Sequence, residues 1–255
     1  MLNGIGVGVP FTQTKGLGNI IRTLLFSNNE VGVMYDPSDF STMFQDSAGT
    51  TPVTAVEQSV GLILDKSGNG NHATQATSTA RPVLRTGLDY DGVDDKHSQS
   101  AGGGSTTQFF LCAGIKPEGG AGAVRVLWSD AGTNTGYIVR LNASNQLELA
   151  AGNGTAYTTI ATVATLDVGT AYVVTVWDDG TNLNVQVNNG AVASVARPVV
   201  AAGTATASIG SDNGAATGWF NGLIYSLIQV KDDAGTDAER ASAKAYVASK
   251  SGVTL

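Results

Sequence analysis

Short apolar segments alternate with turn residues along most of this 255-residue chain. Within residues 183–188, apolar and polar side chains alternate as they do in a strand with one solvated face. The connections are rich in Gly, Asn and Asp, as at 178–182 and 188–190, which indicates hairpin turns. The segments expected to be strands are 60–64, 83–90, 109–115, 124–128, 137–141, 147–150, 157–163, 172–177, 183–188 and 223–230. Many short strands joined by turns predict a mainly β fold of two antiparallel sheets packed as a sandwich.

Two polar motifs lie near the start of this succession. The first, DKSGNGNHAT, covers residues 65–74 and follows the apolar residues 60–64. The second, LDYDGVDD, covers residues 88–95 and places Asp91-Gly92 between apolar residues. An Asp-Gly pair in this setting indicates a tight turn between two strands.

Both ends of the chain predict helices. Leucine and isoleucine recur at helical spacing over residues 17–25, and the helix should end near Ser27. This helix either packs across one end of the sandwich or forms an arm that docks onto a partner subunit. Near the other end, Thr236 and Glu239 form a capping-box pattern, and the helix that follows should continue to about Lys250 and stop at Gly252.

The two motifs resemble the N-terminal part of concanavalin A-like (laminin-G-like) β-sandwich domains, which often read D-x-SGNGNHA followed by FDGVDD. Residues 109–118, 171–190 and 209–224 are similar to later strands of that family, in the family's order. The resemblance covers residues from about 60 to about 230 and implies a jelly-roll sandwich. Because the fold hosts lectins, glycosidases and structural modules, it does not by itself specify a function.

A second resemblance concerns the flanks of the sandwich. Residues 32–53, GVMYDPSDFSTMFQDSAGTTPV, are similar to the N-terminal region of virion proteins of tailed bacteriophages, and the tail that closes on SGVTL is similar to theirs. This resemblance implies a non-enzymatic virion protein, with a tail-fibre, baseplate or receptor-binding role first and capsid decoration as an alternative. A free carbohydrate-binding module is the competing interpretation.

The expected organisation has three parts. Residues 1–58 form an N-terminal arm and irregular attachment segment, residues 59–232 the sandwich, and residues 233–255 a helix packed on the sandwich or on a neighbour. The expected partners are other virion proteins, further copies in a homo-oligomer such as a trimer, and a host surface glycan. The expected location is the virion, after synthesis in the host cytoplasm, since the start lacks the basic and apolar regions of a secretory signal.

Composition argues against several other classes of protein. The formal net charge is −7 and Lys and Arg are not clustered, so nucleic acid is not an expected partner. No apolar stretch approaches the roughly 18 residues of a membrane span. The single cysteine, Cys112, lies in an apolar run and should be a buried, inert thiol.

Catalytic motifs do not emerge, so no catalytic residue is assigned. The E-x-D-x-x-E strand of glucanases with this fold and the G-x-S-x-G elbow of hydrolases are both missing. His72 is expected to be a structural hydrogen-bonding residue, and His97 a solvated or edge-strand residue. Residues 68–73 match G-x-G-x-x-A, but their Asn and His residues would make a poor first helical turn for a dinucleotide site.

Two kinds of binding site are compatible with the sequence. Sugar binding needs an aromatic platform and convergent polar groups, and the loops at 129–136 and 210–219 offer Asp130, Asn134, Asn213 and Trp219. Calcium prefers oxygen ligands, and Asp89, Asp91 and Asp94 cluster in the second motif. No cofactor is expected apart from this calcium, and a solvated turn is the alternative interpretation of the aspartates.

Overall fold

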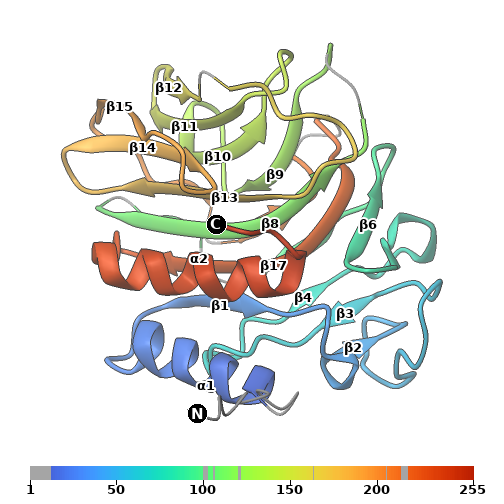
Figure 1. The fold of residues 1–255 in the computed structure, drawn as a ribbon. Coiled ribbons are helices and arrows are strands. Elements are labelled where there is room, and N and C mark those ends of the chain that lie inside the picture. Colours follow the sequence, from blue (N-terminus) through green and yellow to red (C-terminus); the bar gives the residue numbers. More distant parts are fainter. Residues whose placement is uncertain are drawn as a thin grey trace, which may run out of the picture.

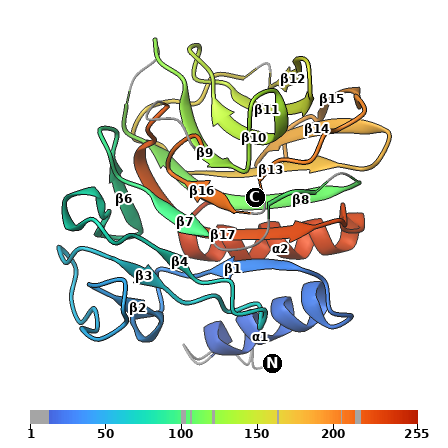
Figure 2. The same ribbon diagram turned by 180° about the vertical axis from the view of Figure 1, so that it is seen from behind.

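The computed structural model describes residues 13–99, 103–105, 107–119, 122–162, 164–204, 206–213 and 218–255. In this part of the chain, two antiparallel sheets pack face to face, and two helices lie on the outer side of one sheet (Figures 1 and 2). The arrangement confirms the mainly β sandwich with a helix near each end of the sequence. Residues 1–12, the start of the expected arm, lie outside the described residues.

The first sheet contains the long strands that carry the helices. Its order is β15 (Ala193–Ala196), β14 (Asn182–Val187), β13 (Tyr172–Asp178), β8 (Phe109–Pro117), β17 (Asn221–Lys231), β6 (Leu88–Asp91) and β5 (Val83–Leu84). Strand β1 (Gly32–Tyr35) pairs with β17 beside β6, because β6 occupies residues 221–224 of β17 and β1 occupies 227–230. Strand β17 therefore joins the N-terminal segment to the middle of the sandwich.

The second sheet forms the opposite layer. Its order is β12 (Tyr157–Ala161), β11 (Leu147–Asn153), β10 (Thr135–Leu141), β9 (Arg125–Ser129), β16 (Ala207–Ile209), β7 (His97–Gln99), β4 (Ala73–Thr74), β3 (Leu62–Ile63) and β2 (Met43–Phe44). Two short 3-10 helices, η1 (Phe40–Thr42) and η2 (Ser78–Ala80), lie in the connections.

Each segment expected to be a strand contains one, with shifted ends, and both hairpins of β13, β14 and β15 are confirmed. The expected strand at 83–90 is two strands that pair with each other across the turn at 85–87. The Asp91-Gly92 turn joins β6 to β7, which belongs to the other sheet, so it is a crossover and not a hairpin. Strands β1, β2, β4, β7 and β15 were not expected, because they are short and most lack a clear alternating pattern, and β16 was expected only from the resemblance at residues 209–224.

Strand β7 corrects the expectation for His97. This side chain is fully buried between the sheets, with Nδ1 3.0 Å from the Tyr90 hydroxyl and Nε2 3.0 Å from the Val60 carbonyl oxygen. Burial lowers the pKa of His97 to about 4, so the ring is neutral and structural at ordinary pH.

The two sheets enclose an apolar core built around stacked aromatic rings. Phe109 stacks on Trp128 with ring centroids 5.1 Å apart and on Tyr137 with centroids 5.0 Å apart. The Tyr137 hydroxyl donates to Asp178 at 2.7 Å, and Arg197 forms an ion pair with the same carboxylate. The only polar atom of Tyr137's ring therefore has a partner, as a buried hydroxyl requires.

The helices cover a second apolar layer on the outer face of the first sheet. Helix α2 (Asp237–Ser251) buries Tyr246 and Val247 there. Cys112 lies in the same layer and is fully buried, as expected, and burial raises the pKa of its thiol to about 12. Helix α1 (Gln13–Phe26) buries Ile21 and Leu25 in the same layer. The N-terminal helix thus packs on its own sandwich, and each of these side chains contributes on the order of 2 kcal/mol.

The capping box of α2 is confirmed. The Thr236 hydroxyl accepts from the Glu239 backbone N–H, and the Glu239 carboxylate accepts from the Thr236 backbone N–H. Gly252 ends the helix in the left-handed conformation, with φ of +70°. None of the described helices is both long and apolar enough to cross a membrane.

The first polar motif closes the free edge of β1. Both oxygens of the Asp65 carboxylate are used: Oδ1 accepts from the backbone N–H of Met34 (2.9 Å) and Ser67 (2.8 Å), and Oδ2 accepts from the Asn71 N–H (3.0 Å) and the Ser67 hydroxyl (2.6 Å). The Asn71 side-chain amide donates to the Gly32 carbonyl at 3.0 Å. An edge strand normally presents unpaired backbone groups to solvent, and here the motif pairs them.

His72 completes the motif in a structural role. Its Nδ1 accepts a hydrogen bond from the Asp65 backbone N–H at 3.0 Å, which holds the loop closed behind the carboxylate. The G-x-G-x-x-A match at 68–73 is therefore part of a loop that leads into β4, and no helix begins within it.

Strands β1 and β2 come from the segment expected to be an irregular arm. Strand β1 pairs along β17 in the first sheet, and β2 pairs with β3 in the second. Val33, Met34 and Met43 are fully buried. In the described part, the sandwich therefore begins at Gly32, and residue 58 does not mark its edge.

We predict that Asp65→Asn lowers the free energy of unfolding by about 2–4 kcal/mol, because an amide nitrogen cannot accept the hydrogen bonds that a carboxylate oxygen accepts in this position. Urea unfolding followed by tryptophan fluorescence measures the change. Asp46→Asn is the matched control, since Asp46 accepts a similar set of backbone hydrogen bonds in an exposed loop. Equal losses in the two variants would contradict a special role for the β1 edge.

Candidate functional site

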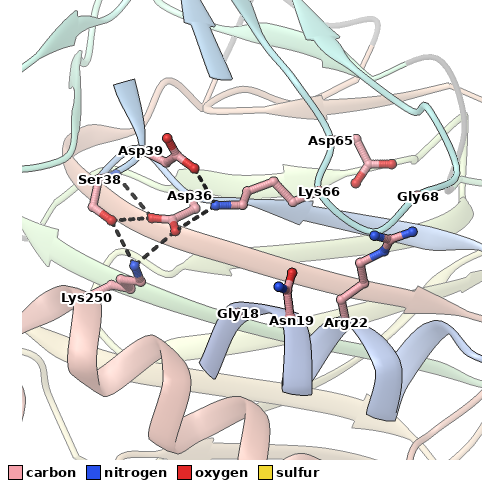
Figure 3. A pocket seen from close by; sticks show the side chains of 10 residues that line it. All are labelled: Gly18, Asn19, Arg22, Asp36, Ser38, Asp39, Asp65, Lys66, Gly68 and Lys250. Carbon is pink, nitrogen blue, oxygen red and sulfur yellow. Dashed lines mark hydrogen bonds and ion pairs between the residues drawn. The ribbon is translucent and has the colours of Figure 1, made fainter. Parts of the chain in front are cut away.

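A cavity of about 530 Å³ lies where both helices, the turn after β1 and the first polar motif meet (Figure 3). Helix α1 contributes one wall, and the last turn of α2 contributes another. The lining residues are Gly18, Asn19, Arg22, Asp36, Ser38, Asp39, Asp65, Lys66, Gly68 and Lys250. Its volume falls in the range of small-molecule sites, about 300–1,000 Å³, but its lining is far more polar than usual.

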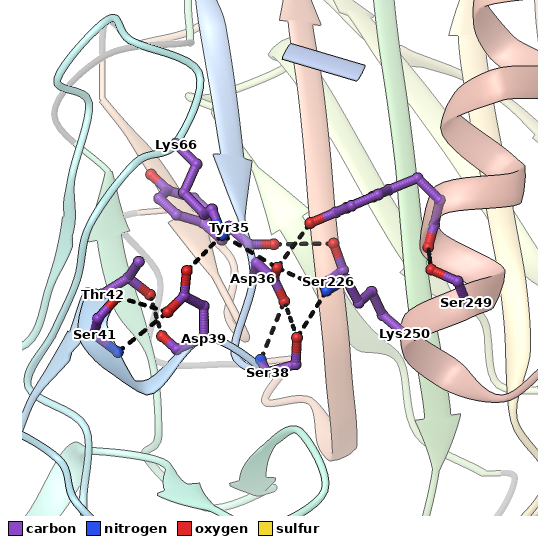
Figure 4. Close-up of polar contacts among 11 residues, drawn as sticks. Tyr35, Asp36, Ser38, Asp39, Ser41, Thr42, Lys66, Ser226, Ser249 and Lys250 are labelled. Atoms are coloured by element: carbon purple, nitrogen blue, oxygen red, sulfur yellow. Dashed lines mark hydrogen bonds and ion pairs between the residues drawn. The ribbon is translucent and has the colours of Figure 1, made fainter. Parts of the chain in front are cut away.

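Asp36 is the buried centre of the polar network at this cavity (Figure 4). Its Oδ2 lies 3.0 Å from the Lys250 ammonium and 3.3 Å from the Lys66 ammonium, and it accepts from the Tyr246 hydroxyl at 2.8 Å. The Ser38 hydroxyl donates to Oδ1 at 2.5 Å. One carboxylate thus connects the turn after β1 to the first motif and to α2.

The ionised form of Asp36 is favoured by this surrounding. Burial acts to raise its pKa, but the hydrogen bond from Ser38 and the charge and hydrogen bond of Lys250 outweigh burial, so that the pKa is lowered overall. The pKa of Asp39 is lowered in the same way. Burial acts to raise it, but the hydrogen bonds from Lys66 and Ser41 outweigh burial. Both carboxylates that approach Lys66 are therefore charged at neutral pH.

Arg22 attaches α1 to the first motif. Its Nε donates to the Ser67 carbonyl oxygen at 3.1 Å, and its guanidinium lies over Gly68. Gly68 has φ of +103°, a conformation that L side chains rarely adopt, so a side chain there would be strained. A Cβ at this position would also lie 2.9 Å from Arg22 Nη2 and would force the guanidinium to shift.

The charges that line the cavity balance. Three cations, Arg22, Lys66 and Lys250, face three carboxylates, those of Asp36, Asp39 and Asp65. Asn19 adds an exposed amide from α1, and it points into the space in Figure 3. A lining of donors and acceptors without net charge suits an uncharged ligand rich in hydroxyl groups better than an anion or an apolar molecule.

The sequence did not predict this cavity. Its charged residues lie in four separate segments. Asp65 and Lys66 belong to the first motif, Asp36 and Asp39 to the segment that resembles virion proteins, and Arg22 and Lys250 to the two expected helices. The Asp36-Pro37 turn and the first motif are both local signals in the sequence. Nothing in the sequence says that the last turn of α2 reaches the turn and the motif together.

The sugar-binding candidates divide into two places. Asp130 and Asn213 meet at Thr204, which donates its backbone N–H to the Asp130 carbonyl (2.8 Å) and whose hydroxyl accepts from the Asn213 amide. Asn134 lies in the adjoining turn, with φ of +56°, and its carbonyl accepts from Gly154 N–H. Trp219 lies elsewhere, because the residue before it pairs with Val126 at the other end of β9.

Asp130 organises these loops from inside. It is fully buried, and its carboxylate accepts from the backbone N–H of Gly104 and Tyr137, both at 2.6 Å. Burial raises its pKa to about 6 against the opposing effect of these hydrogen bonds. Its carboxylate is thus engaged with the backbone, and a ligand at the surface would not reach it.

Trp219 is half-buried, and the Lys96 ammonium lies 5.9 Å from its ring centroid. This contact is a cation–π interaction. The remaining exposed ring is an aromatic surface without the predicted polar partners beside it.

The structure brings only two of the three calcium candidates together and adds a neighbouring aspartate to them. Asp91, Asp94 and Asp95 bring carboxylate oxygens within 4.8 Å of one another, whereas Asp89 forms an ion pair with Arg85 at 3.1 Å. Asp91 Oδ1 already accepts from the Val93 and Asp94 N–H groups, and Asp95 Oδ2 accepts from Asp91 N–H. Two of the three carboxylates are thus already used within the turn, which leaves fewer free oxygens than the six to eight that calcium takes and fits the turn interpretation better.

We predict that Asp36→Asn lowers the free energy of unfolding at pH 7 by about 2–4 kcal/mol, because it leaves Lys66 and Lys250 without their shared buried partner. A lowered folded-state pKa stabilises above the unfolded pKa of roughly 4, and this stabilisation disappears as pH falls through the folded value. The difference between variant and wild type should therefore shrink at pH 2–3 in urea titrations. A difference independent of pH would contradict an ionic role.

For Asp95 the dependence of stability on pH has the opposite sign to that of Asp36, because its pKa is raised. Burial, and next the neighbouring aspartates Asp91, Asp94 and Asp89, raise its pKa to about 6 against a backbone hydrogen bond from Asp91. The folded state then holds a proton that the unfolded state has lost, so stability falls as pH rises from about 4 to 6. Asp95→Asn should raise the free energy of unfolding at pH 8 by about 1–2 kcal/mol and change little at pH 4. Thermal unfolding at the two pH values measures this, and a stabilisation at both would refute the charge argument.

Comparison with protein-family models gives no match, and comparison with curated protein sequences gives none. Solved structures do match. A GH54 α-L-arabinofuranosidase is 13% identical with a TM-score of 0.62, covering 86% of this chain and 62% of its own. A Trypanosoma rangeli sialidase is 12% identical with a TM-score of 0.57, covering 93% and 39%.

A third similar structure is the ligand-binding domain of Botulinum neurotoxin serotype D in complex with N-acetylneuraminic acid. It is 9% identical with a TM-score of 0.60, covering 90% of this chain and 52% of the other. The chain thus spans less than two thirds of each of these three proteins. At these identities the likeness concerns the fold alone, a concanavalin A-like β-sandwich of two antiparallel sheets.

Proposed function

We propose that this chain is a non-catalytic saccharide-binding module of a tailed-bacteriophage particle, and that the cavity between its helices is the binding site. The observation that carries the proposal is the charge-balanced lining of that cavity, which brings lysine and arginine donors together with aspartate acceptors. A sugar hydroxyl donates one hydrogen bond and accepts others, so it can bridge such neighbours. The ligand class is therefore a mono- or disaccharide unit of a host surface glycan.

The state of the carboxylates supports a binding role over hydrolysis. Glycosidases need one carboxyl group that keeps its proton as a general acid beside a second that is ionised. Asp36 and Asp39 both approach Lys66, at 3.3 and 2.8 Å, and both have lowered pKa values. The third carboxylate, that of Asp65, is held by backbone donors and its own loop. No carboxyl group of the cavity is placed to deliver a proton.

The assignment to a virion rests on the resemblance of residues 32–53 to phage structural proteins. This segment supplies β1, the Asp36 turn and β2, so the same residues that resemble the virion proteins also build one wall of the cavity. A receptor-binding, tail-fibre or baseplate position follows, because a module there meets the host glycan first. In a virion, such a module works beside other structural proteins.

Similar structures offer a fold-level analogy. The neurotoxin domain is in complex with a sugar acid, and the other two similar structures belong to enzymes that act on glycosides by name. Function has to come from the site of each protein, so the analogy supports only the class of ligand.

The test of this proposal is binding of the full chain to a glycan array, followed by calorimetry on the best ligand. Asn19→Ala removes one cavity amide and should weaken binding about fivefold, the equivalent of roughly 1 kcal/mol for one hydrogen bond. Asn19→Trp should abolish binding by filling the space. Thr23→Ala is the matched control, since Thr23 is exposed on the same helix but does not line the cavity.

Unchanged affinity in both Asn19 variants would place the ligand elsewhere on the module. Release of reducing ends from the bound glycan would refute the non-catalytic role. Immunogold labelling of phage particles tests the location, and label on the tail tip supports the proposed position.

A further inference from the structure

The edge strands on the two sides of the sandwich differ in length. On one side the edges are the two-residue strands β5 and β2, and the edge of β1 is closed by the first motif. On the other side the edge strands are β15, with four residues, and β12, with five. Figures 1 and 2 show β15 at the outer margin of the first sheet, beyond β14. Strand β15 is therefore the open end of the sheet that carries both helices.

The phase of the β14–β15 ladder tells which backbone groups of β15 are free. Arg197 N–H donates to the Thr181 carbonyl at 2.8 Å, and the register continues through Leu183 opposite Val195. In an antiparallel pair, hydrogen-bonded and non-hydrogen-bonded residues alternate. Val195 and Ala193 therefore bond to β14, and Ser194 and Ala196 direct their N–H and C=O groups away from the sheet.

Side chains do not protect this edge. Residues 189–196, NGAVASVA, contain no charge and no proline, the devices with which proteins usually block edge strands. Val192 and Val199 flank the strand and are 46% and 85% exposed. Among the described residues, the charges nearest in sequence are internally paired, as in the Arg197–Asp178 ion pair.

We propose that β15 pairs antiparallel with β15 of a second copy across a two-fold axis, joining the two first sheets into one. An exposed row of backbone donors and acceptors is a template on which another strand can pair. A segment paired antiparallel with itself is self-complementary under two-fold symmetry. Because residues 189–196 are uncharged, this pairing never places like charges opposite each other, although each chain carries a net charge of −7.

This interface lies away from the cavity and does not depend on the proposed saccharide binding. The second copy would extend the sheet sideways and leave α1, α2 and the cavity of each protomer uncovered. Two equivalent cavities on one dimer would bind a repeating glycan more tightly than one.

Sedimentation velocity of the full chain over a wide concentration range tests the proposal. The wild type should form a dimer. Ala196→Pro removes an outward N–H without touching the ladder to β14, and Ala196→Lys adds a charge from each copy to the uncharged paired edges, so both should shift the protein to monomer. Ala238→Lys is the control, because it adds the same charge at an exposed position of α2 and should still dimerise.

Circular dichroism and the thermal midpoint separate dissociation from unfolding, and both should stay at wild-type values in the two Ala196 variants. A wild type that sediments as a monomer at all concentrations, or as a trimer, would overturn the proposal. So would a dimer that persists in Ala196→Pro and Ala196→Lys. Monomers produced equally by Ala238→Lys would place the interface on the helices instead.

Discussion

The Asp65 carboxylate is the interaction on which the arrangement of this molecule depends. Four donors from three residues converge on it, and one of them is the outward N–H of Met34 on β1. Without it, β1 would be an open edge beside the longest strand of the sheet. With it, the N-terminal segment is fixed along β17, and the turn that follows β1 places Asp36 against α2.

The cavity follows from that same clamp. The loop that carries Asp65 also carries Lys66, which binds Asp36 and Asp39, and Gly68, over which Arg22 of α1 lies. Helix α2 reaches the network through Tyr246 and Lys250. One short motif therefore determines how the strand, both helices and the polar lining meet. Hydrogen bonds and ion pairs from several segments hold the polar lining in place. Groups that are positioned in advance lose less conformational freedom when a small polar ligand binds.

The sequence predicted the long strands, the hairpins after β13 and β14 and the C-terminal capping box, since alternation, turn residues and capping are local signals. It did not predict β7, because His97 and Gln99 are polar and become buried only through partners such as Tyr90 that lie in the other sheet. It also did not predict that Asp130 would turn inward while Trp219 would lie at the far end of β9. The cavity itself unites residues as distant as Asp36 and Lys250, and no local pattern encodes that contact.

Native-state hydrogen exchange of the Met34 amide is the most direct test of the claim that the first motif closes the edge of β1. Met34 directs its N–H away from β17 and toward Asp65, so its protection reports the clamp alone. We predict that the Met34 amide exchanges as slowly as the amide of Val33 on the same buried strand. Asp65→Asn should accelerate exchange at Met34 much more than at Val33. Rapid exchange of Met34 in the wild type, at the rate of an open edge strand, would contradict this prediction.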